Sequence, residues 1–197
     1  ATLEYENVRI NVSKFINCNS NEIIFTKGTT ESINLVSYCL GESLLTKNDE
    51  VIITEMEHHS NIVPWQLLSE RKNIKLKYIP ISVNGELELK KINSLITNKT
   101  KLISITHMSN LLGTINDIKK IIAIAKKNHI LTMIDAAQSI SHEKINVKNL
   151  DCDFLVFSGH KIFGPTGVGV LYGKSKLLND FPPYLGGGHM IEEVSMN

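Results

Sequence analysis

The feature that most constrains the fold of this 197-residue chain is an alternation of short apolar runs with segments of helical periodicity. Six runs are rich in β-branched residues and bounded by polar turns, which predicts strands. They are Glu22–Phe25, Val51–Thr54, Leu76–Pro80, Leu102–Thr106, Ile130–Ile134 and Phe154–Phe157. Such an alternation predicts an α/β fold in which a mostly parallel sheet lies between two layers of helices.

Two helices and one further strand complete the expected topology. The segment Asp117–Asn128 places its isoleucines on one face and its lysines off that face, as an amphipathic helix does. A second helix is expected over Thr29–Leu40, ending near Gly41. The apolar run Val168–Tyr172 follows the preceding strand after only a short loop. A short connection cannot make a parallel crossover, so we expect this strand to be antiparallel to its neighbour.

Charge and cysteine content argue against several classes of function. The 21 basic and 20 acidic residues give a formal net charge of +1, which favours neither nucleic acid nor an anionic membrane as a partner. No apolar run approaches the ~20 residues of a membrane span. Cys18, Cys39 and Cys152 are widely spaced, so we expect no disulfide framework, no metal site and a reducing compartment.

Polar side chains follow five of the predicted strands. In open α/β sheets, ligands bind beyond the carboxyl ends of the strands. The polar segments are Thr26–Glu31, Glu55–Asn61, His107–Asn110, Asp135–Gln138 and Ser158–Lys161. We therefore expect one site that is assembled from several loops at one end of the sheet.

Two of these segments have more than one interpretation. Thr29 and Thr30 open a helix directly after a strand, where they can either cap the helix or help to bind a phosphate group. His58 and His59 can form a metal pair, a packed turn, or a ring that stacks on a ligand. Adjacent histidines rarely bind one ion, and no third ligand is evident at a suitable spacing, so stacking is favoured over metal binding.

Two further residues point to a cofactor. Asp135 ends a central strand, where a carboxylate can cap a helix or pair with a buried cationic ring nitrogen. Lys161 lies between apolar segments, so we expect it to be half-buried and able to act as the amine nucleophile of Schiff-base chemistry. A lysine, an aspartate, a stacking ring and a phosphate-binding turn are together what pyridoxal phosphate (PLP) requires of a protein.

These motifs also carry a resemblance to a known family. In chain order they are TKGTTESINLV at 26–36, MEHHSNIVPW at 56–65, THMSNLLGT at 106–114, DAAQ at 135–138 and SGHKIFGPTG at 158–167. From about Asn21 to Met190 the chain resembles the SufS-type cysteine desulfurases of the class V aminotransferase superfamily. The pair Pro64-Trp65 favours this branch over the IscS/NifS branch. The resemblance implies the aspartate aminotransferase-like fold of PLP-dependent transferases, with residues 1–197 as a three-layer αβα large domain containing one antiparallel strand.

The resemblance implies a role for each candidate site residue. Lys161 would form the Schiff base with PLP and later move protons, and His58 would stack on the ring and serve as an acid–base group. Asp135 would pair with the pyridinium nitrogen, and Gln138 would hydrogen-bond to the phenolic oxygen. Asn110 would contact the substrate or the ring hydroxyl. The phosphate would be held by Thr29, Thr30, Ser158 and His160.

Two groups that the family requires have no counterpart in these motifs. The three cysteines lie in contexts typical of packing positions, and Arg9 and Arg71 lie outside the site segments. In the family, the sulfur-accepting cysteine and the carboxylate-binding arginine belong to a C-terminal small domain. We therefore expect a chain that is truncated at both ends, lacks that domain and is inactive in turnover on its own.

For the parent protein, the resemblance implies conversion of L-cysteine to L-alanine by a homodimer. The persulfide sulfur would pass to a SUF-type acceptor protein for iron–sulfur cluster assembly. The alternatives are a selenocysteine lyase or another class V PLP lyase and, for the chain alone, a catalytically silent domain that keeps only the fold. Kinship, together with an abundance of Lys, Asn and Ile, suggests a plastid-type organelle (apicoplast) or the bacterial cytoplasm.

Overall fold

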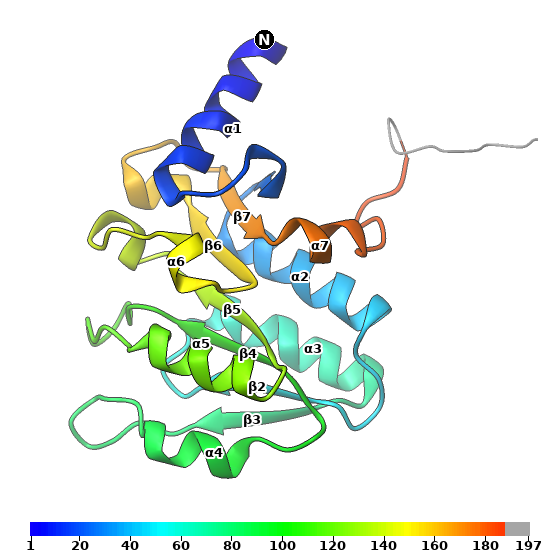
Figure 1. Ribbon diagram of the computed structural model, residues 1–197, viewed down its shortest axis with the longest axis vertical. Helices are drawn as coiled ribbons and strands as arrows, with labels where there is room; N and C mark the ends of the chain where they lie inside the picture. The colour runs from blue at the N-terminus through cyan, green and yellow to red at the C-terminus, as the bar shows by residue number, and fades with distance from the viewer. Residues whose placement is uncertain (188–197) are drawn as a thin grey trace, which may run out of the picture.

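The computed structural model describes residues 1–187, so the last residues of the resemblance, 188–190, lie outside the described part. Within these described residues, seven strands form a single sheet in the order β1-β7-β6-β5-β4-β2-β3 (Figure 1). They are β1 (Ile23–Thr26), β2 (Glu50–Thr54), β3 (Lys75–Ile79), β4 (Thr100–Thr106), β5 (Leu131–Asp135), β6 (Phe154–Ser158) and β7 (Gly169–Gly173). All seven predicted strands are therefore present, with bounds that differ by one or two residues from those expected.

Strand β7 is antiparallel to both of its neighbours, β1 and β6, whereas the other paired strands are parallel. The prediction of a mostly parallel sheet with one antiparallel strand is thus confirmed. In the registers of the parallel strands, Thr106 at the end of β4 lies opposite Asp135 at the end of β5, and Asp135 lies opposite Val156 in β6. These registers bring the carboxyl ends of the central strands together at one end of the sheet.

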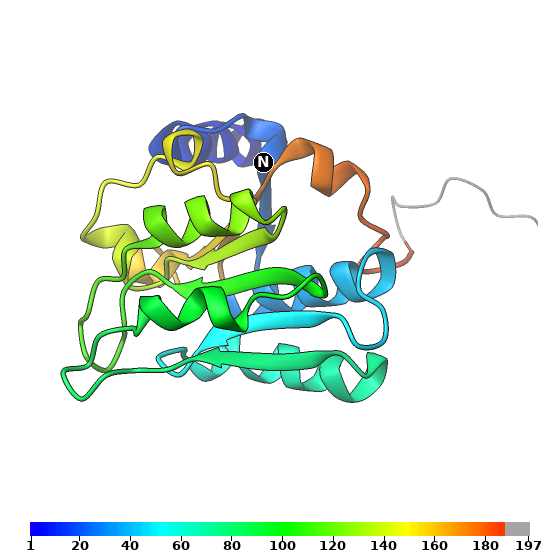
Figure 2. The ribbon, with the colours of Figure 1, turned by 60° about the horizontal axis from the view of Figure 1, so that its bottom comes forward.

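Helices cover both faces of the sheet. They are α1 (Thr2–Ile16), α2 (Thr29–Ser43), α3 (Val63–Lys72), α4 (Ile92–Leu95), α5 (Ile118–Lys127), α6 (Val147–Leu150) and α7 (Ser175–Asn179). One buried cluster joins α1, α4, α5 and α6 to one face, and a second joins α2, α3 and α7 to the other. Figure 2 shows the green helices α4 and α5 on the near side of the strands. The predicted three-layer αβα architecture is confirmed.

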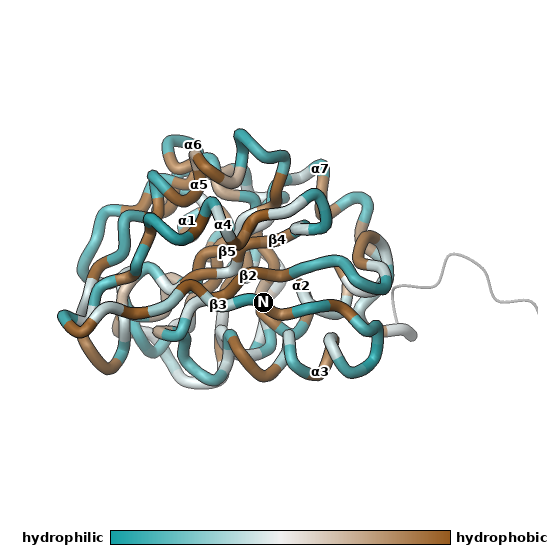
Figure 3. The backbone as a smooth tube through the Cα atoms, turned by 90° about the horizontal axis from the view of Figure 1, so that it is seen from below, coloured by the Kyte–Doolittle hydropathy of each residue, from teal (hydrophilic) through white to brown (hydrophobic). Residues whose placement is uncertain are grey.

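The two apolar clusters explain why the chain folds in this way. Figure 3 shows apolar backbone along β2, β4 and β5 in the interior and mostly polar positions around it. Successive side chains of a strand point to opposite faces, so Ile52 and Ile53 in β2 enter different clusters. Strands buried on both faces are continuously apolar rather than alternating, which is the pattern of the predicted strands.

One predicted helix matches the structure closely, and the other is longer than expected. Asp117 caps α5 by accepting a hydrogen bond from the backbone N–H of Lys120 at 3.1 Å. Helix α2, however, continues through Gly41 to Ser43. A Cβ atom at position 41 would lie 2.5 Å from Cδ1 of Leu68. Gly41 therefore permits close packing of α2 on α3, and it does not end the helix.

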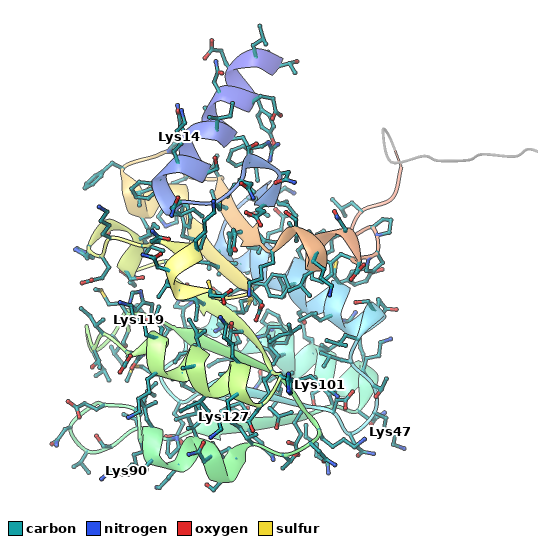
Figure 4. All side chains as sticks on the ribbon, in the orientation of Figure 1. Lys14, Lys47, Lys90, Lys101, Lys119 and Lys127 are labelled. Atoms are coloured by element: carbon teal, nitrogen blue, oxygen red, sulfur yellow. The ribbon has the colours of Figure 1, made fainter. Side chains whose placement is uncertain are left out.

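Most lysine side chains lie around the outside of the molecule. The six lysines labelled in Figure 4 point away from the sheet from well-separated segments. They are Lys14, Lys47, Lys90, Lys101, Lys119 and Lys127. None of the helices within residues 1–187 is long and apolar enough to cross a bilayer.

Candidate functional site

A cavity of about 290 Å³ lies where the polar segments meet. This volume is at the lower end of the range of small-molecule sites, about 300–1,000 Å³. All nine predicted site residues line the cavity, namely Thr29, Thr30, His58, Asn110, Asp135, Gln138, Ser158, His160 and Lys161. Strand ends that are far apart in the sequence therefore form one site.

Sequence reasoning missed four residues that also line the cavity, namely Ser60, Thr106, Met108 and Ala137. Thr106 is the last residue of β4 and is paired in register with Asp135. That pairing is the signal that points to Thr106, since the two residues end adjacent parallel strands. Ala137 lies two residues after Asp135 and donates its backbone N–H to it. Its contribution comes from the main chain, which the side-chain pattern does not reveal.

Asp135 is the buried charged group of the cavity. One carboxylate oxygen accepts a hydrogen bond from the N–H of Ala137 at 2.9 Å. The following 3₁₀ turn (Ser139–Ser141) has Gln138 at its N-cap position, so Asp135 does not cap it. Burial raises the pKa of Asp135 to about 6, although this hydrogen bond opposes the shift. Within residues 1–187, no ion pair involves Asp135. The carboxyl group is thus suited to a cationic partner supplied by a ligand.

The turn between β1 and α2 forms one wall of the cavity. Gly28 occupies the N-cap position of α2, so no side chain of the N-cap residue caps this helix. The hydroxyl of Thr29 instead lies 2.8 Å from the hydroxyl of Ser158, which also accepts the Thr29 N–H at 2.9 Å. The interpretation of Thr29 as a side-chain cap is therefore wrong. Two hydroxyls and a helix N-terminus converge here, which is an arrangement that favours an anion.

Close approach of two glycines makes this wall possible. A Cβ atom on Gly169, at the start of β7, would lie 2.4 Å from Cα of Gly28. The backbone of the β1–α2 turn therefore packs directly on the sheet. This contact sets the position of Thr29 relative to Ser158.

A chain of hydrogen bonds orients His58. The hydroxyl of Thr30 donates to the hydroxyl of Ser60 at 3.1 Å, and that hydroxyl lies 2.7 Å from Nδ1 of His58. The backbone N–H of Ser60 also donates to the same nitrogen at 3.2 Å. A backbone N–H can only donate, so Nδ1 is an acceptor and the neutral ring carries its proton on Nε2. The imidazole is thus held in one tautomer at the mouth of the cavity.

The remaining predicted residues come from three loops. Lys161 is half-buried, as predicted, within the 3₁₀ turn η5 (Gly159–Ile162), and His160 in the same turn is exposed. Gln138 is half-buried after β5, and Asn110 is exposed after β4. These residues line the cavity with the amine of Lys161, the side-chain amides of Gln138 and Asn110, and the imidazole of His160.

The histidine pair does not resemble a metal site. The rings of His58 and His59 are tilted by 58° with their centroids 5.8 Å apart. In the described part of the chain, no group of three or more His, Cys, Asp or Glu residues is arranged to hold a metal ion.

No cysteine or arginine lines the cavity within residues 1–187. Cys39 and Cys152 are buried and Cys18 is half-buried, and all three thiols are free. Burial raises the pKa of Cys18 and Cys152 to about 12 and that of Cys39 to about 11. These thiols are poor nucleophiles near neutral pH because the thiolate is the reactive form. The interpretation of the three cysteines as packing residues is consistent with this burial.

Comparison with known proteins gives the family and several relatives. The family profile described as aminotransferase class-V matches residues 1–197. The chain is 56% identical over 198 residues to a cysteine desulfurase of Wigglesworthia glossinidia brevipalpis and 50% identical over 197 residues to one of Serratia proteamaculans (strain 568). Each alignment covers 100% of this chain and 48% of the relative. The chain therefore spans about half the length of the curated relatives it matches.

Solved structures show the same fold. The cysteine desulfurase CsdA from Escherichia coli superposes with a TM-score of 0.94 at 39% identity, over 98% of this chain and 49% of that one. The cysteine desulfurase from Thermococcus onnurineus NA1, an apo structure, gives a TM-score of 0.93 at 42% identity, over 99% of this chain and 48% of that one. The fold of PLP-dependent transferases inferred from the sequence is confirmed by these matches.

Proposed function

Because the chain belongs to the class-V aminotransferase family, we propose that it is the PLP-binding large domain of a cysteine desulfurase. The observation that carries the proposal is one cavity lined by a lysine, by a buried aspartate that forms no ion pair within residues 1–187 and by a hydroxyl-rich helix N-terminus. The relatives at 56% and 50% identity are named as cysteine desulfurases, which favours cysteine over selenocysteine as the substrate of the parent protein.

The cavity residues fit PLP on physical grounds. Asp135 is buried and has no cationic partner among residues 1–187, and a protonated ring nitrogen would supply one. Thr29 and Ser158, which line the same cavity, present hydroxyls beside the N-terminus of α2, where a phosphate dianion is stabilised. A ligand that carries both a cationic ring nitrogen and a phosphate would match these two kinds of group.

Each residue would then have a defined task. Asp135 would hold the proton of the ring nitrogen, and the Nε2–H of His58 would face the ligand from the opening. Lys161 would bind the aldehyde carbon covalently and later carry a proton to or from the substrate. Gln138 and Asn110 would donate amide N–H groups to the ring oxygen and to the substrate. The phosphate would be bound by Thr29, Thr30, Ser158 and His160.

PLP, when bound, supplies a conjugated ring that accepts the electrons of the bond broken at the substrate Cα. The net reaction that we propose for the parent protein is L-cysteine plus a protein thiol giving L-alanine plus a protein persulfide. The buried cysteines of this chain, with their raised pKa values, are unsuited to be that thiol. We therefore assign the thiol, and an arginine for the substrate carboxylate, to a part of the parent protein other than residues 1–187.

The proposal is tested by titrating the chain with PLP and following the visible absorbance of covalently bound cofactor. We expect saturable binding, and we expect the parent protein that contains this chain to release alanine from L-cysteine in a PLP-dependent way. Absence of bound PLP under conditions where the chain is folded would exclude the assignment. Binding of PLP without alanine release by the parent would favour another class V lyase.

The remaining parts of the assignment rest on kinship. The curated relatives reported above are bacterial, which favours the bacterial cytoplasm over a plastid-type organelle. A SUF-type sulfur acceptor and a homodimeric parent are also proposed. Pull-down of a SUF-type acceptor by the parent protein tests the first point. The mass of the parent protein, measured by light scattering, tests the second.

A further inference from the structure

Behind the wall of the cavity lies a network of buried polar side chains centred on Glu57. Its carboxylate receives hydrogen bonds from three separate elements. The hydroxyl of Thr54, at the end of β2, lies 2.6 Å from Oε1, and the backbone N–H of Thr106, at the end of β4, donates to the same oxygen at 2.9 Å. The amide Nδ2 of Asn61, in the 3₁₀ turn η2 (His59–Asn61), donates to Oε2 at 2.7 Å. Glu57 thus joins two strands to the turn that follows His58.

The orientation of Asn61 is fixed by a second pair of contacts. Its Oδ1 accepts the indole N–H of Trp65 at 3.0 Å and the hydroxyl of Ser104 at 2.6 Å. An indole N–H can only donate, so Oδ1 must face Trp65 and Nδ2 must face Glu57. The backbone N–H of Thr106 can also only donate. Both oxygens of Glu57 must therefore be able to accept. A protonated Glu57 meets this requirement, because its proton on Oε1 can be donated to the Thr54 hydroxyl, which can also accept, while the oxygen keeps a lone pair for the Thr106 N–H. Glutamine does not, because its amide nitrogen cannot accept and would face a donor.

The network lies next to the charged group of the cavity. Thr106 is in register with Asp135, and adjacent strands are about 4.8 Å apart. Burial raises the pKa of Glu57 to about 8, the three hydrogen bonds oppose this shift, and the negative charge of Asp135 adds to it. Two buried carboxyl groups without a cation between them resist ionising together.

The other groups that face Glu57 do not titrate. They are Thr54 from β2, Thr106 from β4 and Asn61 from η2, which bind Glu57 directly. Ser104 from β4 and Trp65 from α3, which also do not titrate in this pH range, contact Asn61 behind them. Asp135 from β5 is the ionisable group whose charge acts on Glu57. His58, the next residue in the chain, directs its Nδ1 to Ser60.

We propose that Glu57 is a positioning residue, which fixes the turn that carries His58 to the end of β4 and takes up or releases a proton according to the charge on Asp135. The proposal depends on the proposed function only in taking His58 as the side chain that faces the cofactor ring. Through this coupling, a cation bound at Asp135 would offset the carboxylate charge and lower the pH at which Glu57 ionises.

Trp65 offers a direct readout because it is the only tryptophan of the chain, is fully buried and donates to Asn61. We would record its fluorescence in the PLP-free chain between about pH 5 and about pH 10. The wild type should show a transition centred on about pH 8, the pKa of Glu57. In Asp135→Asn the transition should move to lower pH by about 1 unit, the shift expected for a unit charge within about 10 Å at an effective dielectric constant near 20.

Two controls separate Glu57 from its neighbours. His58→Gln removes the adjacent titratable ring and should leave the transition in place, whereas Glu57→Gln should remove it. A wild-type signal that is flat with pH, or a transition at the same pH in Asp135→Asn, would overturn the coupling. If Glu57→Gln does not fold, the comparison of the wild type with Asp135→Asn still decides this part of the proposal.

The positioning part is tested by hydrogen exchange. Glu57→Asp keeps the charge but shortens the side chain, so amide exchange in residues 55–61 should accelerate about 10-fold or more, as expected when a buried hydrogen bond is lost. Exchange in the β4–α5 loop, residues 107–116, should change little. Unchanged exchange in 55–61, or an equal rise throughout the chain, contradicts a positioning role. Both tests use PLP-free protein, so their failure is distinguishable from failure to bind PLP.

Discussion

Replacing Asp135 with asparagine should stabilise the ligand-free chain at neutral and alkaline pH. Burial raises the pKa of this carboxyl from 3.8 to about 6. The free energy of unfolding therefore falls as pH rises from the pKa of the unfolded chain to that of the folded chain, because the unfolded chain releases the proton first. At about 1.4 kcal/mol per pKa unit, the shift corresponds to about 3 kcal/mol. Asparagine carries no charge, and its Oδ1 can still accept the N–H of Ala137.

The sign of the pH dependence follows from which state holds the proton. A carboxyl whose folded pKa is raised favours folding while it is protonated, and that contribution is lost as pH rises from about 3.8 to about 6. The difference between Asp135→Asn and the wild type should therefore be small at about pH 4 and reach about 1–3 kcal/mol at about pH 8. The same variant should bind PLP more weakly, since it lacks the charge that we propose to pair with the ring nitrogen.

Urea unfolding followed by the fluorescence of Trp65 measures both points on one protein. Ser175→Ala, at the start of α7 and away from the cavity, serves as a control that should show no such pH-dependent difference. Equal stability of Asp135→Asn and wild type at about pH 8, or a loss of stability that grows with pH, would show that burial does not raise the pKa of Asp135. Either result would mean that the buried carboxylate has a partner or solvation that its contacts do not reveal.

Two further predictions concern the backbone of the cavity and the thiols. Gly169→Ala should lower the free energy of unfolding by about 1–3 kcal/mol and weaken PLP binding, because its Cβ would lie 2.4 Å from Cα of Gly28. Gly186→Ala, with no atom within 4 Å of the added Cβ, is the matched control, and equal effects in urea unfolding would contradict the packing argument. The chain given PLP and L-cysteine should release no alanine and form no protein persulfide, because its thiols are buried with raised pKa values. Turnover that is lost in Cys152→Ser would show that this thiol is reactive.

Much of the fold was predictable because strands buried on both faces are short, continuous and apolar. The seven predicted strands and the helix capped by Asp117 match the structure for this reason. The extent of α2 was not predictable, because Gly41 is a helix breaker by intrinsic propensity. Only the packing of α2 on Leu68 shows why glycine is kept within the helix.

The sequence predicts most of the side chains that line the cavity, but not the buried groups that lie behind them. The nine residues inferred from strand ends and motifs all line one cavity, because parallel strands bring their carboxyl ends together. Glu57 lies within the predicted site segment Glu55–Asn61, but its sequence context gives it no role of its own. Its hydrogen-bond partners are Thr54, Asn61 and Thr106, and a linear sequence does not show that these residues meet at one carboxylate.

Lys161 is the residue to which we propose that PLP attaches, and peptide mapping identifies the modified lysine. The chain would be incubated with PLP, reduced with borohydride, digested and analysed by mass spectrometry. We predict the PLP-derived mass on the peptide that contains Lys161, and its loss in Lys161→Ala with an unchanged circular dichroism spectrum. Labelling of a different lysine, or equal labelling in Lys161→Ala, would contradict the account of the cavity as a PLP site.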